Sequence, residues 1–296
     1  MHIKKTLMFV SLTVYLIIIS VGCSSYNQTD STEFPELPTT QTSQLESEHL
    51  TLKLNFKGDI LRADGSKQAW TQETMKPFVD ALESFSKVIK GVKGKENHSL
   101  TIDIHVNDFN GGNGAATVDY CSLIMVDNKP IPTQGYIVIN NRLYDEPEVF
   151  ESPADNEDIM SEFNANIHHE MGHVFGIGCL WEVVDDSGNK IGSLVESEKS
   201  TGTGRVSYNM PKTIVAYNKI FGTQLDFVPI SDDDSHFYDY AESNDKKRTE
   251  GIWKNIKSAP YDLMANGYTI TMLTASALDD IGWDIDYSYV KEYIIN

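Results

Sequence analysis

The segment HEMGH at positions 169–173 constrains the fold of this 296-residue chain more than any other feature of its sequence. His169 and His173 are four positions apart, and residues with that spacing lie one turn apart on one face of an α-helix. Two imidazoles held in this way can bind one Zn²⁺ ion, while Glu170 on the same helix can reach a water molecule beside the ion. The segment therefore predicts a helix, from about residue 157 to residue 175, that carries a zinc site.

The residues around the motif agree with a helix that packs on one side. Gly172 in mid-helix costs about 1 kcal/mol relative to Ala, which indicates close packing at this position. Gly176 can adopt a positive φ and end the helix three residues after His173. His168 is interpreted as a bystander, because position 172 offers it no partner one turn away. The expected apolar side of the helix consists of Ile167, Met171 and Val174.

A zinc ion that keeps one position open for water needs a third protein ligand. The chain has eight histidines, and His236 is the one that follows the motif. If a later histidine completes the site, it must therefore be His236. Two alternatives stay open: the thiolate of Cys179, which can also bind zinc, and a downstream glutamate, either Glu196 or Glu198.

With these residues in place, H-E-x-x-H-x-x-G resembles the metzincin group of zinc proteases. Most of that group place the third histidine three residues after the glycine, and this chain has Cys179 there. The leishmanolysin-like family instead has a long insertion before its third histidine. In this chain 62 residues separate His173 from His236, which suits that arrangement. The segment HEMGHVFGIGCLW is especially similar to bacterial members of the family.

Three further segments are similar to the leishmanolysin-like family, so that the resemblance covers roughly residues 50–285. Residues 261–264 (YDLM) resemble its methionine turn, in which Met264 would form a floor beneath the imidazoles. Residues 271–282 resemble its closing helix, and residues 135–140 (GYIVIN) resemble the strand along its cleft.

The resemblance implies a zinc endopeptidase that acts on extracellular or envelope proteins. Zinc would lower the pKa of its bound water and polarise the scissile carbonyl, and Glu170 would act as general base. An extended substrate would add to the sheet edge along residues 136–140 through backbone hydrogen bonds. An alternative from another class is a surface binding lipoprotein on an inactive protease scaffold, against which the intact Glu170 argues.

The remaining patterns predict a mixed sheet with helices packed on it, and the resemblance implies an α+β fold of metzincin type. A mixed twisted sheet with the active-site helix would form an N-terminal catalytic subdomain at 49–178. A mostly irregular C-terminal subdomain at 179–296 would carry the third ligand and end in a helix. Residues 143–158 are interpreted as a connection. The expected strands are 50–56, 100–106 and 136–140, and the other expected helices are 72–90, 212–221 and 271–281.

The N-terminus predicts export. Residues 1–22 combine Lys4 and Lys5 with an apolar run that is too short for a membrane span. Residues 20–23 (SVGC) resemble a bacterial lipoprotein signal in which Cys23 carries the lipid, and a plain secretory signal is the alternative. Residues 23–48 predict a flexible tether. We therefore expect a bacterial envelope lipoprotein in the outer membrane or at the cell surface, with secretion as the fallback.

Charge and cysteine content restrict the partners. The net charge of −19 argues against binding to nucleic acid and favours solubility outside the cell. The resemblance implies protein or peptide substrates, and we expect a monomer. With Cys23 lipidated, an oxidising compartment allows a disulfide between Cys121 and Cys179, and two free buried thiols are the alternative. The acidic runs at 185–186 and 232–234 form no complete calcium loop, so we interpret them as solvated surface.

Overall fold

The computed structural model describes the chain from residue 37 to residue 290, with gaps. The predicted signal segment, Cys23, Glu196, Glu198 and both acidic runs lie outside the described residues. Within the described part, none of the helices has the length and apolar character that crossing a bilayer requires. The described residues are 37–108, 113–145, 161–181, 183, 205–207, 209–231, 235–238, 256–259, 262–265, 267 and 269–290.

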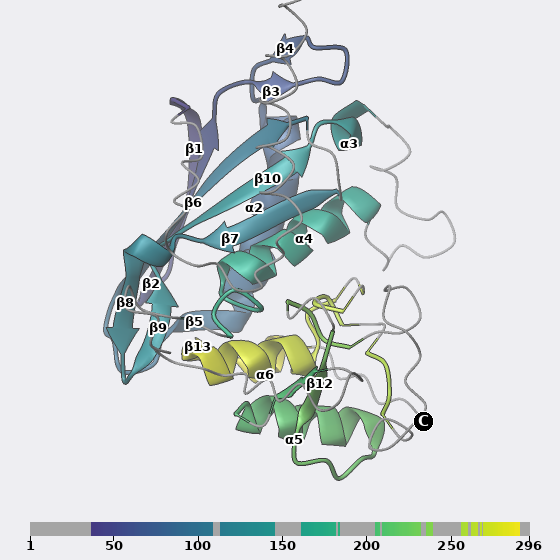
Figure 1. Ribbon diagram of the computed structural model, residues 1–296. Coiled ribbons are helices and arrows are strands. Elements are labelled where there is room, and N and C mark those ends of the chain that lie inside the picture. Colours follow the sequence, from purple (N-terminus) through teal and green to yellow (C-terminus); the bar gives the residue numbers. More distant parts are fainter. Residues whose placement is uncertain are drawn as a thin grey trace, which may run out of the picture.

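A five-stranded mixed sheet forms the upper part of the molecule (Figure 1). Its order is β1-β2-β6-β10-β7; the three central strands run parallel, and the two edge strands pair antiparallel to their neighbours. The mixed sheet and all three expected strands are thereby confirmed, and the fold is compatible with the α+β class. The strands are β1 (Thr39–Glu46), β2 (Leu50–Lys57), β6 (His98–Asn107), β10 (Gln134–Asn140) and β7 (Gly114–Val118).

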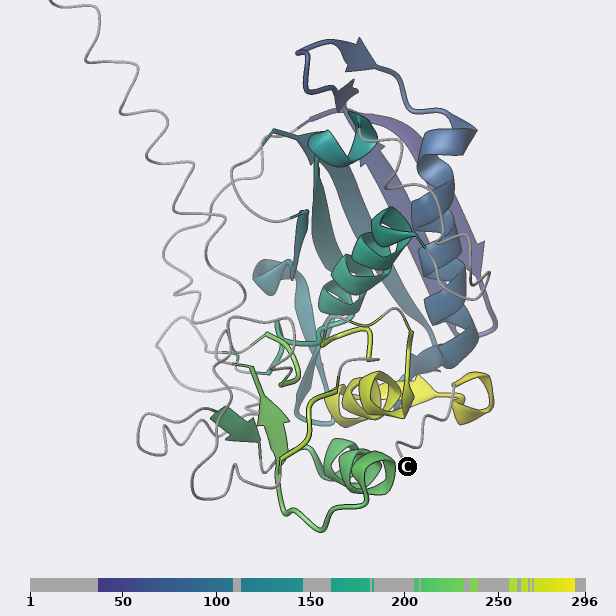
Figure 2. The same cartoon turned by 90° about the vertical axis from the view of Figure 1, so that its right-hand side faces the viewer.

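Two long helices, α2 (Gln72–Val88) and α4 (Glu162–Val174), lie side by side on one face of the sheet (Figure 2). The alternation of β2 explains this, because every second side chain from Leu50 to Phe56 is buried. Thr71 begins α2 with a capping box shared with Thr74. The helix predicted at 72–90 is confirmed, although its last two residues belong to the following strand.

The second half of the chain adds two helices below α4 (Figure 1). They are α5 (Pro211–Phe221) and α6 (Met272–Ile281), which pack on each other and confirm the two helices expected here. After α6 the chain returns to the first half, because β13 (Trp283–Ile285) pairs antiparallel with β5 (Ile89–Val92). The indole of Trp283 is fully buried and donates a hydrogen bond to the carbonyl of Phe175 (2.8 Å). The end of α6 is thus fixed against the end of α4.

The remaining elements are short. Three two-stranded ribbons and three single turns of helix connect the parts already described. They are β3 (Ile60–Leu61), β4 (Lys67–Gln68), η1 (Tyr120–Ser122), β8 (Leu123–Val126), β9 (Lys129–Pro132), α3 (Arg142–Asp145), β11 (Arg205–Ser207), β12 (Val228–Ile230) and η4 (Tyr287–Tyr289).

Two expectations about connecting segments are wrong in part. The predicted tether at 23–48 contains β1, which pairs with β2 along its whole length. Most β1 side chains are exposed, so the strand is held by backbone pairing and shows little apolar periodicity in the sequence. The predicted connection at 143–158 begins inside the short helix α3. Residues 23–36 and 146–158 lie outside the described part of the chain.

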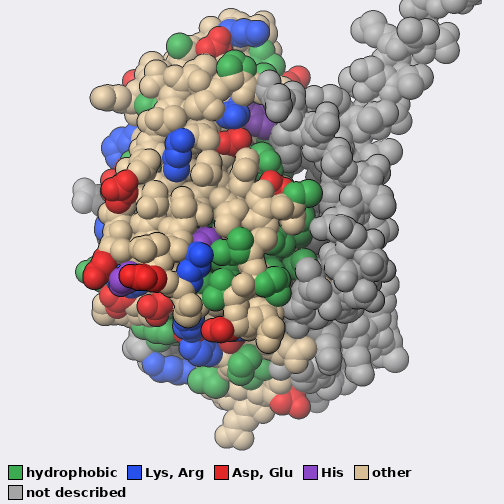
Figure 3. All heavy atoms as spheres, turned by 90° about the vertical axis from the view of Figure 1, so that its left-hand side faces the viewer, with side chains coloured by type: hydrophobic (Ala, Val, Ile, Leu, Met, Phe, Trp, Pro, Cys, Tyr) green, Lys and Arg blue, Asp and Glu red, His purple; other side chains and the backbone are tan. Residues whose placement is uncertain are grey.

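The acidic charge is not concentrated on the face shown in Figure 3. Among the described residues of that face, Asp and Glu side chains alternate with Lys and Arg side chains. This mixed surface agrees with a soluble exterior.

The stability of this fold should fall in acid because His105 is buried. Burial lowers its pKa from 6.5 to about 4, with Asp103 raising and Lys57 lowering it to smaller extents. The unfolded chain therefore binds more protons between these two values, and the free energy of unfolding falls as the pH drops through this window. The loss at pH 5 is about 2 kcal/mol for this one group.

We expect the variant His105→Gln to lose correspondingly less stability than wild type between pH 7 and pH 5. The check is urea unfolding at both pH values in the presence of a chelator, so that metal binding does not contribute. Equal losses in the two proteins would contradict the prediction.

Candidate metal centre

The helix α4 presents the motif as the sequence predicts. Ser161 begins the helix, its hydroxyl accepting a hydrogen bond from the backbone N–H of Asn164 (3.3 Å). Gly176 has φ 108°, and a Cβ added there would lie 2.6 Å from Leu180 Cδ1. Position 176 therefore requires glycine for both its conformation and its packing, and the predicted helix end is confirmed within one residue.

The three predicted histidines converge on one point. The Nε2 atoms of His169 and His236 lie 2.8 Å apart, and the Nε2 of His173 lies 3.2 Å from each of them. A tetrahedral ion with bonds of about 2.05 Å would separate its nitrogen ligands by about 3.3 Å. The donor set therefore fits a single metal ion, and it is the one His/Cys/Asp/Glu group of this kind among the described residues.

Backbone carbonyls fix the tautomers of two ligands. The Nδ1 of His169 lies 2.8 Å from the carbonyl oxygen of Leu263, and the Nδ1 of His173 lies 2.9 Å from that of Ile177. Because a carbonyl can only accept, each Nδ1 must carry the proton, and each Nε2 then offers its lone pair to the common point. His173 is buried, whereas His169 and His236 are half-buried, so two of the three ligand side chains remain partly exposed to solvent.

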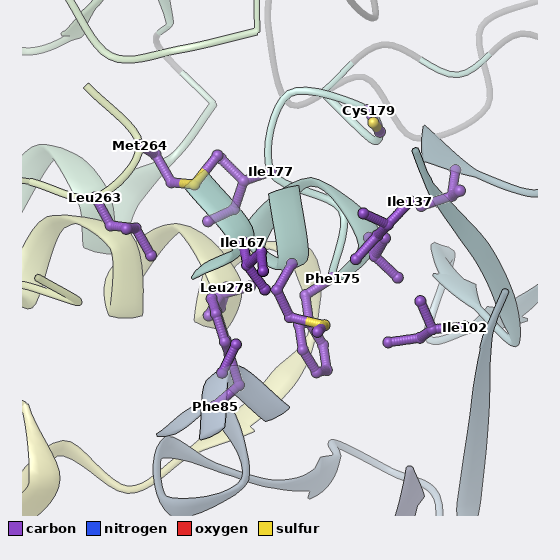
Figure 4. Packing of buried hydrophobic residues seen from close by; sticks show 14 of the residues in the cluster. Phe85, Ile102, Ile137, Ile167, Phe175, Ile177, Cys179, Leu263, Met264 and Leu278 are labelled. Atoms are coloured by element: carbon purple, nitrogen blue, oxygen red, sulfur yellow. The ribbon is translucent and has the colours of Figure 1, made fainter. Parts of the chain in front are cut away.

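Two other side chains near the motif, those of His168 and Cys179, do not join the histidine group. His168 bonds through Nδ1 to the carbonyl of Asn164 (2.8 Å) and through Nε2 to the Ser84 hydroxyl (3.3 Å), so it is a bystander. Cys179 is fully buried, with Sγ 3.9 Å from the carbonyl oxygen of Ala116 in β7, and does not belong to the histidine group. Figure 4 shows it on the side of Ile137, away from Met264.

The predicted Cys121–Cys179 disulfide is wrong. Cys121 is a free cysteine in the turn η1, where its backbone N–H is bonded to the Asp119 carboxylate (3.0 Å). Its side chain is exposed, whereas that of Cys179 is fully buried. The cysteine count allowed this pairing, but the local turn directs Cys121 to the surface.

Glu170 lies beside the histidines and against the first residue of β7. Its side chain is buried, and burial raises the pKa of its carboxyl group to about 8. A Cβ added to Gly114 would lie 2.9 Å from Glu170 Cγ and 3.0 Å from its Oε1. Gly114 thus makes room for the carboxylate. Sequence analysis did not identify this contact.

The strand expected to bind a substrate is the wrong one. β10, which contains residues 136–140, is paired on both sides, with β6 and with β7. Its backbone groups are therefore occupied. The edge of the sheet on this side is β7, which also packs directly against α4.

The Met264 side chain packs against the ligand helix α4 at Gly172. It is fully buried, and a Cβ added to Gly172 would lie 2.4 Å from its Sδ atom. Figure 4 shows its sulfur directed toward the end of the helix and Ile177. The close packing predicted at Gly172 is confirmed. The neighbouring Tyr261 lies outside the described residues.

The segment that carries His236 is held by backbone contacts on both sides. The carbonyl of His236 accepts a hydrogen bond from Ser231 N (2.9 Å), and Phe237 N donates to the carbonyl of Met264 (2.9 Å). Gly178 has φ 75°, and a Cβ added there would lie 2.5 Å from the carbonyl oxygen of Ser235. Sequence analysis missed Gly178, for which the signal was a second glycine two residues after Gly176.

Comparisons with known proteins add no family assignment. No protein-family model matches the chain, and no curated protein matches it. The resemblance to leishmanolysin-like proteases therefore rests on the residues named above and stays a prediction.

Replacing Gly178 with Ala should weaken metal binding, because the added methyl group must displace the backbone of Ser235 and with it His236. We expect a loss of at least about tenfold in Zn²⁺ affinity, measured by competition with a chromophoric chelator. The matched control is Gly222→Ala, where φ is 63° and no atom lies within 4 Å of the added Cβ. Both variants place a non-glycine residue in a left-handed conformation, which costs each of them about 1–2 kcal/mol of stability. Equal Zn²⁺ affinities of the two variants would therefore contradict the prediction.

Removing the third imidazole should abolish tight metal binding. We expect His236→Ala to lose Zn²⁺ during gel filtration, because two ligands remain where three converge. His168→Gln is the control, since it removes a neighbouring imidazole that points away from the centre. Full retention by His236→Ala, with loss on replacing Glu196 or Glu198, would instead favour a glutamate ligand.

Proposed function

We propose that this protein is a zinc-dependent endopeptidase. The observation that carries the proposal is the convergence of three Nε2 atoms beside Glu170, a buried carboxylate on the helix that supplies two of them. Three imidazoles that converge on one point are the donor set of catalytic zinc sites, which keep a fourth position open. His169, His173 and His236 would hold the ion.

The chain's own residues account for the proton transfers of peptide hydrolysis. When bound, such an ion polarises the substrate carbonyl and activates water. Glu170 accepts the proton of the attacking water as general base and returns it to the leaving amine. Burial favours the protonated carboxyl, whereas a cation held by the neighbouring imidazoles favours the carboxylate, so both forms are accessible at the site.

The proposed substrate is an extended peptide that adds to the outer edge of β7, which pairs with no strand among the described residues. This strand forms the rim of the sheet, and Gly114 at its start lies against Glu170. A peptide paired with this end of the strand would therefore pass close to the general base. This arrangement replaces the pairing with residues 136–140, whose strand has no free edge.

We further propose that the enzyme is exported and tethered by a lipid on Cys23, in the outer membrane or at the cell surface. The proposal rests on residues 1–23 of the sequence alone. The substrates would then be envelope or extracellular proteins.

The test is cleavage of unfolded casein by wild type and by Glu170→Gln. Wild type should cleave, lose activity to a chelator and regain it with Zn²⁺. The variant keeps the shape of the side chain and removes the base, so it should be slower by a factor of about 10²–10⁴ while still binding Zn²⁺. Glu83→Gln, an exposed charge removal on α2, should have no effect.

Two outcomes would contradict the proposal. Equal activity of wild type and Glu170→Gln that no chelator affects would point to a contaminating protease. Metal binding without cleavage in either protein would favour the alternative of a surface binding protein on an inactive scaffold.

A further inference from the structure

We propose that Asp262 is a positioning residue of the metal centre, which holds the turn that orients His169 and supports the segment of His236. The inference rests on the metal site of the proposed function. It concerns a residue outside the histidine group and outside the H-E-x-x-H motif.

Asp262 is almost fully buried, and its carboxylate accepts four hydrogen bonds. Oδ1 accepts from Met264 N (2.9 Å) and from the Thr274 hydroxyl (2.7 Å). Oδ2 accepts from Thr274 N (3.0 Å) and from the Thr271 hydroxyl. One carboxylate thereby joins the turn at 262–265 to the first turn of α6, where the positive end of the helix dipole also favours a negative charge.

The same turn contacts three parts of the metal centre. The carbonyl of Leu263 accepts from His169 Nδ1 (2.8 Å), and the carbonyl of Met264 accepts from the N–H of Phe237, the residue after His236. The Met264 side chain packs against Gly172 on the ligand helix. A shift of the turn would therefore move one imidazole directly and the segment of another through its backbone.

The hydrogen-bond pattern requires a carboxylate at this position. Each of its oxygens faces one backbone N–H, that of Met264 or that of Thr274, and neither donor can rotate away. In Asp262→Asn the amide NH₂ must face one of these N–H groups in either orientation, which leaves two buried donors opposed. The substitution preserves size and still disrupts the turn.

Asp279 offers a matched control for the general cost of altering a buried aspartate. It is equally buried, lies near the other end of α6, and accepts from Lys212 Nζ (2.6 Å) and the Tyr287 hydroxyl (2.9 Å). These two partners and Lys93, which forms an ion pair with Asp279, lie outside the turn at 262–265 and outside the ligand segments. Asp279→Asn should therefore lower the melting temperature without changing the metal centre.

The experiment measures metal binding by the full chain. Metal-free wild type, Asp262→Asn and Asp279→Asn are titrated with Co²⁺, whose visible spectrum reports ligand geometry, and Zn²⁺ affinity is measured against a chromophoric chelator. We expect Asp262→Asn to lose about 10- to 100-fold in affinity, the range for residues that orient ligands, and to show an altered Co²⁺ spectrum. Asp279→Asn should keep the wild-type affinity and spectrum.

A milder variant covers the case in which Asp262→Asn does not fold. Thr274→Val removes one hydroxyl donor to the carboxylate and keeps the shape, so it should give a smaller loss of affinity in the same direction. The inference would be overturned if folded Asp262→Asn kept the wild-type affinity and spectrum. If Asp262→Asn does not fold, the same result in Thr274→Val would overturn it. So would equal affinity losses in Asp262→Asn and Asp279→Asn, because the effect would then be general destabilisation.

The outcomes separate this inference from the proposed function. If wild type binds Co²⁺ and does not cleave casein, the protease proposal fails and the role of Asp262 is still decided by the titrations. If wild type binds neither metal, both proposals fail.

Discussion

The contact on which the rest of this structure depends is the approach of three imidazole nitrogens to within 3.2 Å of one another. Two belong to one helical turn, but the third comes from a segment 63 residues further along the chain. For that segment to lie so close to the helix, the backbone at and after the helix must closely approach another backbone segment or a buried side chain. Glycine permits this at Gly172, beneath which Met264 lies, and at Gly178, against which Ser235 lies.

Local patterns predicted much of the fold, because they depend on spacing alone. The alternation at 50–56 and the helical period at 72–90 both correspond to observed elements. His236 was found by counting histidines, which works because few residue types bind zinc. By contrast, β1 and the edge position of β7 arise from pairing between distant segments, and neither leaves a periodic signal in its own sequence.

The residues that sequence analysis missed share one property: each acts through another residue. Asp262 reaches the centre through the carbonyl of Leu263, and Gly114 acts by leaving space for Glu170. A motif search identifies residues that could bind a metal, and it has no means of identifying residues that hold those ligands in place. The same limit explains the wrong cysteine pairing, since the exposure of Cys121 depends on a local turn at Asp119.

The position of the centre is also tied to the hydrophobic core. The Asp262 carboxylate fixes the turn at 262–265 to the start of α6, and the end of α6 leads directly into β13, which pairs with β5 beside the sheet. Trp283 in β13 bonds to the carbonyl of Phe175 at the end of the ligand helix. The turn is therefore fixed at the start of α6, and the ligand helix is fixed near its end. Hydrogen bonds between buried partners thus connect the metal centre to the core, although His169 and His236 are themselves only half-buried.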